Sequence, residues 1–187
     1  LTGVCNPCGK LPVSVAYEAG QIPVYYNHPN GSGWHQGESV GFPEYVDLPH
    51  KPRYAFGHGL SYTSFLYENL RMDKKQVEPY GEILISVDLI NDGGREGIEV
   101  VQLYLRDMFA SVTRPNQELQ GFARVALKPG QKKTVTFTVG ASQLAFPDRD
   151  GRWKTEEGDV EVLLGSASDD IRLTGSFRIS RDGYPEG

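Results

Sequence analysis

The strongest constraint on this chain is a two-residue alternation of apolar and polar side chains that begins near Tyr80. In the run from Ile83 to Leu89, the apolar residues occupy every second position, and the run from Val135 to Val139 repeats the pattern. Successive side chains of a strand point to opposite faces, so this pattern predicts strands that are buried on one face only. The same alternation appears in residues 101–105, 160–164 and 171–179.

Turn residues separate these runs, and they predict a β-sandwich. Asn91–Gly94, Pro129–Gly130, Asp150–Gly151 and Glu157–Asp159 are glycine-containing turn sequences. Many short strands without a helical stretch between them are typical of an immunoglobulin-like sandwich of about 100 residues. We therefore expect a mainly β chain with a sandwich over residues 66–180 and a tail over 181–187.

Residues 1–65 have a different character. The stretches 11–15 and 22–26 have the composition of short strands, but each contains a proline, which central strands exclude. The stretch from Asn27 to Pro52 is long, polar and rich in glycine, histidine and proline, and loops of this length are uncommon inside a compact domain. We expect this first third to need another surface against which to fold. Leu1 is not expected to be the biological N-terminus, so the localisation of the protein stays unknown.

Composition argues against several classes of partner and cofactor. A net charge of -5 leaves no basic surface for nucleic acid, and no apolar run approaches the ~20 residues that span a bilayer. Cys5 and Cys8 lack the second ligand pair of a zinc site and the strand–helix setting of a redox motif. We expect no metal and no cofactor.

No residue of the chain is expected to be catalytic. Hydrolysis by paired carboxylates needs two acidic side chains beside the bond that is cleaved, and none of the 24 acidic residues stands in a setting that marks it. Only Glu38, Glu44 and Asp47 have aromatic neighbours in the long loop. Ser61 and His58 are close in sequence, but a catalytic triad is a spatial arrangement, and a glycine-rich turn explains them better.

Trp34 and His35 are the candidate substrate-binding residues. A Gly-Ser-Gly-Trp loop can present an indole face to the C–H face of a sugar. The alternative interpretation, equally weighted, is that Trp34 attaches the loop to its own protein.

The chain resembles the C-terminal part of glycoside hydrolase family 3, which includes β-glucosidases and β-xylosidases. Residues 52–65, PRYAFGHGLSYTSF, are similar to the family sequence PFGxGLSYTxF, with Ala55 in place of proline. Residues 6–12 resemble NPSGKLP, with Cys8 in place of serine, and residues 20–27 resemble GQIPVYYN. Residues 99–122 are similar to a long sequence of the fibronectin type III-like domain, although Lys133 stands where a tyrosine is usual.

This resemblance implies that the catalytic aspartate and glutamate lie in preceding domains and are absent from this chain. Residues 1–65 would close the second, α/β sandwich domain, and 66–180 would form the fibronectin type III-like domain. The implied partners are the remaining barrel and α/β sandwich domains of the same enzyme, a β-linked oligosaccharide or glycoside, and a second copy of the protein in a homo-oligomer.

Two other functions remain to be weighed. A free-standing carbohydrate-binding or adhesion sandwich would display a line of aromatic side chains, whereas the predicted strands expose Thr, Arg, Ser and Glu. A small independent hydrolase lacks a convincing active-site group.

Overall fold

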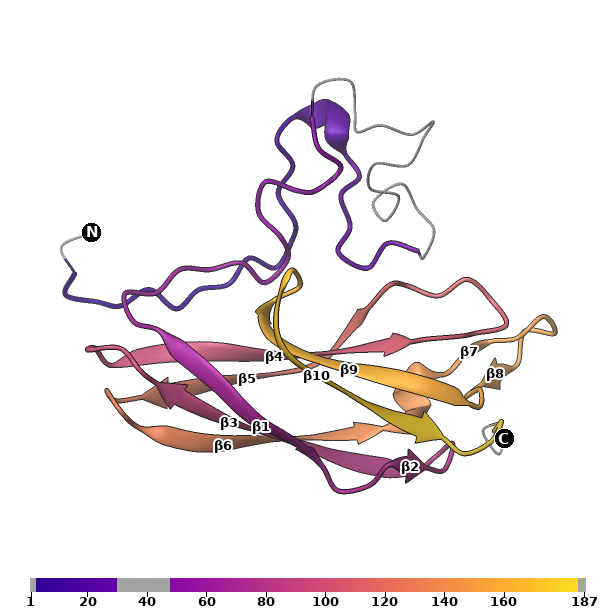
Figure 1. Ribbon diagram of the computed structural model, residues 1–187. Coiled ribbons are helices and arrows are strands. Elements are labelled where there is room, and N and C mark those ends of the chain that lie inside the picture. The colour runs from indigo at the N-terminus through magenta and orange to yellow at the C-terminus, as the bar shows by residue number, and fades with distance from the viewer. Residues whose placement is uncertain (1–2, 30–47, 185–187) are drawn as a thin grey trace.

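The computed structural model describes residues 3–29 and 48–184, in which two β-sheets pack face to face as a sandwich (Figure 1). The smaller sheet has the strand order β1-β3-β6, and the larger has the order β2-β10-β9-β4-β5. A two-stranded ribbon, β7-β8, lies at one end. The strands are β1 Phe65–Met72, β2 Gln76–Val77, β3 Glu82–Asn91, β4 Gly97–Asp107, β5 Glu118–Leu127, β6 Lys132–Gly140, β7 Phe146–Pro147, β8 Trp153–Lys154, β9 Gly158–Ala167 and β10 Asp170–Ile179; the 3-10 turns are η1 Ala19–Gln21 and η3 Ala141–Leu144.

The alternation in the sequence forms the core as predicted. The inward residues of β3 and β6 are buried, whereas the threonines of β6 face solvent. Every member of the buried apolar cluster lies between Phe65 and Ile179, so the sandwich has a core of its own. Burial of apolar area at about 25 cal/mol per Å² is the main force that holds the two sheets together. The buried inward residues of these two strands are Ile83, Ile85, Val87, Leu89, Val135, Phe137 and Val139.

The turn between β5 and β6 has the predicted chemistry. Gly130 adopts a φ of 71°, in the left-handed region that favours glycine, and the Gln131 amide donates to the Lys128 carbonyl at 2.9 Å. The Gly130 amide donates to the carbonyl of Asn91, which attaches the turn to the end of β3.

The prediction of one-sided burial is wrong for β4 and β9. From Glu99 to Leu105 every residue is buried, and β9 is buried on both faces from Val162 to Ala167. The physical reason is that residues preceding the sandwich cover the outer face of the larger sheet around these two strands (Figure 1).

The two proline-containing stretches, which have the composition of short strands, do not form strands. Within the described residues before Phe65, the only regular element is η1, and pairing is limited to isolated bridges such as Val15 with Tyr54. Pro12 and Pro23 each lack a backbone donor. The 11–15 stretch makes only a few backbone hydrogen bonds to residues 53–58, through Leu11 and Val15, and forms no ladder. We call residues 3–29 and 48–64 the leading segment.

Candidate functional site

The leading segment meets the sandwich through a buried polar network on β4. The Gln102 side chain donates to the carbonyls of Ser166, at 2.5 Å, and Gly57, at 3.3 Å. It also accepts the hydroxyl hydrogen of Tyr104 at 2.5 Å, and burial raises the pKa of Tyr104 above its usual value. The amide of Ser168 donates to the carbonyl of Phe56 at 2.9 Å. The side-chain amide of Gln102 and the hydroxyl of Tyr104 are therefore both paired, which fixes the leading segment at one position on the sheet.

Aromatic rings complete this junction. The ring of Tyr26 stacks on Phe56 with centroids 4.2 Å apart and meets the Tyr104 ring edge-on at 5.8 Å. The Tyr26 hydroxyl also accepts a hydrogen bond from the backbone amide of Leu119 at 3.2 Å. Aromatic pairs of this kind contribute about 0.5–1.5 kcal/mol beyond burial.

Charged and amide side chains hold the beginning of the leading segment. Lys10 forms an ion pair with Glu99 at 3.1 Å, and both side chains are largely buried. The side-chain oxygen Oδ1 of Asn6 accepts a hydrogen bond from the Tyr62 backbone amide at 2.7 Å and one from the Ser61 hydroxyl at 3.1 Å. Ser61 is thus a structural residue of this turn, and the ring of His58 lies against Tyr54 at 5.1 Å. The structure brings Ser61 and His58 into no catalytic arrangement.

An apolar groove of about 350 Å³ lies on the leading segment. Its exposed side chains include Val13, Ile22 and Tyr25. Soluble monomers rarely leave contiguous apolar surface in water, so this groove indicates an interaction site. The groove is lined by Pro12, Val13, Ser14, Ala16, Ile22, Pro23, Val24, Tyr25, Tyr26, Asn27 and Phe56.

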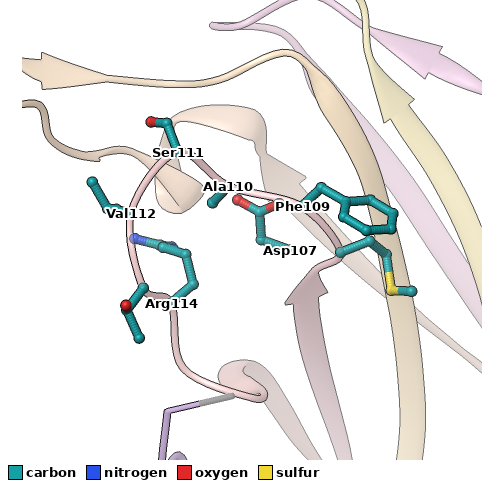
Figure 2. A pocket seen from close by; sticks show the side chains of 8 residues that line it. Asp107, Phe109, Ala110, Ser111, Val112 and Arg114 are labelled. Carbon is teal, nitrogen blue, oxygen red and sulfur yellow. The ribbon is translucent and has the colours of Figure 1, made fainter. Parts of the chain in front are cut away.

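A second hollow, of about 500 Å³, lies in the loop between β4 and β5. Figure 2 shows Asp107 and Arg114 within the curve of this loop, whereas the Phe109 ring projects away from it. Burial raises the pKa of Asp107, although the nearby Arg114 charge opposes the shift. Arg114 donates to Glu118 at 3.0 Å and lies 5.1 Å from the ring centroid of Phe146.

The residues proposed from the sequence as substrate contacts, Trp34 and His35, lie outside the described residues, as do Glu38, Glu44 and Asp47. Cys5 and Cys8 are free thiols. Among residues 3–29 and 48–184 no group of three His, Cys, Asp or Glu side chains is placed to hold a metal ion. Over the same ranges, no helix has the length and apolarity to cross a membrane.

Two features of the site were missed from the sequence. Gln102 and Tyr104 occupy the positions of β4 that the alternation assigns to the outer face. An amide side chain next to an aromatic ring at such positions indicates that another segment covers this face of the sheet. The adjacent Met108 and Phe109 are exposed in a loop, and two large apolar residues between two strands are a signal of an interaction loop.

The sequence of the chain is similar to those of known proteins. Residues 99–168 match the fibronectin type III-like domain. The periplasmic β-glucosidase of Salmonella typhimurium is 38% identical over 181 residues, which are 96% of this chain and 24% of that protein. The chain corresponds to the C-terminal portion of a family 3 glycoside hydrolase. A β-xylosidase of Formosa agariphila is 38% identical over 91% of this chain and 23% of its own length.

A solved structure extends the agreement to three dimensions. The β-glucosidase of Listeria innocua, crystallised with glucose, superposes with a TM-score of 0.87 at 34% identity. The match covers 98% of this chain and 25% of that one. The chain thus spans about a quarter of the length of the relatives that it matches.

Proposed function

We propose that this chain is the non-catalytic C-terminal part of a retaining β-glycosidase that hydrolyses terminal β-linked glucose or xylose units. Its role is to stabilise the preceding barrel and α/β sandwich domains by packing against them. The relatives named β-glucosidase and β-xylosidase support this activity for the whole enzyme.

The observation that carries the proposal is the apolar groove on the leading segment. This segment has one side covered by the larger sheet, yet Ile22 remains 65% exposed and Val13 59% exposed. A segment with no strand or long helix cannot bury such side chains alone, so it needs another apolar surface. The preceding domains of the same polypeptide supply that surface.

The first test is to place a charge in the groove of the full-length enzyme. Ile22→Asp should lower the melting temperature of the full-length enzyme by several degrees, because a buried unpaired carboxylate is costly. The same substitution should leave the 187-residue chain almost unchanged, since Ile22 is exposed there. Leu66→Asp, on an exposed position of β1, is the matched control. Equal effects of Ile22→Asp in the two proteins would contradict the proposal.

The second test concerns catalysis by the 187-residue chain. We expect no hydrolysis of aryl β-glucosides or β-xylosides, because the family's catalytic aspartate and glutamate belong to the preceding domains. Turnover that persists through rigorous purification and copurifies with the chain would overturn this expectation.

We also propose that Trp34 contacts the sugar from a loop at the rim of the active site. The support is the sequence alone: a long glycine-containing loop with a single indole. In the full-length enzyme, Trp34→Ala should raise KM several-fold with a smaller effect on kcat, since the contact acts through binding. An unchanged KM with a lower melting temperature would identify Trp34 as a structural residue.

A further inference from the structure

We propose that the loop from Asp107 to Arg114 is a second docking surface for the catalytic part of the same polypeptide, with Phe109 as its anchor. This inference rests on the proposed function, because it takes the preceding domains as the occupant. It assigns a contact to a part of the sandwich distinct from the groove on the leading segment.

The exposure of the loop's apolar side chains is the first argument. Phe109 is 80% exposed and Met108 is 41% exposed, at the point where β4 ends. Protein interfaces are commonly centred on one or two large side chains that enter a pocket of the partner. Because the ring of Phe109 is exposed, a partner can cover it without breaking contacts inside the sandwich.

Continuity with the first docking surface is the second argument. The end of the loop is attached to the leading segment, because the Asn116 amide donates to the His28 carbonyl at 2.8 Å. Pro29 and Pro115 form an isolated bridge directly beside this bond. The loop therefore rises on the same side of the sandwich as the leading segment (Figure 1), and one partner can cover both.

The loop is also held in shape before any partner arrives. The Ser111 amide donates to the Glu156 carboxylate at 2.8 Å, and the Met108 amide donates to the Asp159 carbonyl at 3.2 Å. Arg114 reaches across the loop to the Leu144 carbonyl at 3.3 Å. A loop ordered in advance reduces the entropy cost of association.

The geometry favours a protein partner over a sugar. A sugar site needs an aromatic face and hydrogen-bonding groups directed at the same place. Here the ring of Phe109 projects away from the loop interior, where Asp107 and Arg114 lie (Figure 2). The ring is therefore exposed apart from Asp107 and Arg114, which suits a side chain that enters an apolar pocket of a protein partner.

The experiment compares Phe109→Ala in the full-length enzyme and in the 187-residue chain. The expected result is a melting temperature lower by about 2–4 °C in the full-length enzyme and unchanged in the chain. Phe122→Ala is the matched control, because Phe122 is also an exposed phenylalanine, on β5, and we expect it to be silent in both proteins. Hydrogen exchange gives a second readout: the amides of residues 108–113 should exchange at least ~10-fold more slowly in the full-length enzyme.

Three results would overturn the inference. Equal melting temperatures of wild-type and Phe109→Ala full-length enzyme, with unchanged amide exchange, would show that nothing covers the loop. A raised KM without a change in melting temperature would assign the loop to sugar binding. Dissociation of an oligomer by Phe109→Ala, seen by light scattering, would assign it to a second copy. The Ile22→Asp result is independent of all three, so failure here leaves the proposed function standing if that substitution behaves as expected.

Discussion

At the scale of single residues, a few polar side chains decide how the two parts of the chain are joined. Gln102 uses both its donor and its acceptor within the junction, and its partners come from β4, from β9 and from the leading segment. The sequence places Gln102 on the wrong side of the alternation for a core residue. Its role was unpredictable because it depends on a covering segment almost fifty residues away.

Gln102→Ala should destabilise the 187-residue chain by about 2 kcal/mol or more, because it leaves buried polar groups of Tyr104, Gly57 and Ser166 without this partner. Urea denaturation measures the loss. Gln76→Ala, at an exposed position of β2, should change the stability by less than about 0.5 kcal/mol. A loss of equal size in the two variants would mean that the network contributes nothing specific.

Asp88 is a second residue whose setting yields a prediction. It lies on β3, and hydrogen bonds from Arg71, Asn69, Thr134 and Lys132 hold its pKa far below the usual range. The folded pKa is therefore depressed, so ionised Asp88 stabilises the fold above the unfolded-state value of about 3.9. That stabilisation is lost as the pH falls from there toward the folded pKa.

Asp88→Asn should accordingly be less stable than wild type at pH 7, and the difference should shrink as the pH falls below about 4. Urea denaturation at pH 7, 4 and 2.5 measures both quantities. Asp92→Asn, at an exposed turn position, serves as control and should follow the wild type throughout. A stability difference that stays constant with pH would show that the charge of Asp88 is not the source of its effect.

At the scale of elements, the sequence predicted a strand correctly where the contacts of that strand follow from its own alternation of apolar and polar residues. Alternation identified β3 and β6 because each has one face on the core and one face in water. It misjudged β4 and β9 because the covering surface comes from outside the sandwich, and no pattern within a strand reports what lies on its outer face. The proline-containing stretches form no strands, which agrees with the loss of a backbone donor at each proline.

The absence of a side chain at Gly57 allows the leading segment to lie close against β4. Its φ is 83°, and a Cβ there would collide with the side chain of Gln102. Gly57→Ala should therefore cost about 2 kcal/mol or more, from backbone strain together with displacement of the junction. Thermal unfolding checks this, with Gly94→Ala as control because a Cβ at Gly94 meets open space. Equal melting temperatures for the two variants would refute the close contact.

At the scale of the whole molecule, the sandwich has its own apolar core, whereas the leading segment has none and depends on its contacts with the sandwich. The buried apolar cluster begins at Phe65, whereas residues before it are held by a polar network, by stacked rings and by the Lys10–Glu99 pair. The division at residue 65 was drawn from the change in sequence pattern, and it remains a prediction. The proposal for Trp34 and His35 came from the Gly-Ser-Gly-Trp sequence of the loop, and it stays a prediction because both residues lie outside the described ranges.

Residues 66–180 should fold without the leading segment, but with lower stability than the whole chain, because the outer face of β4 would lose its cover over Tyr104 and Gln102. Limited proteolysis of the 187-residue chain should cut first within residues 1–64 and leave a resistant fragment that begins near Phe65. The proposed function has the preceding domains covering the groove, so it predicts that the same protease spares residues 3–29 and 48–64 in the full-length enzyme. Resistance of residues 1–64 in the isolated monomeric chain would refute their dependence on a partner. Unfolding of the 66–180 fragment would show instead that the sandwich needs its cover.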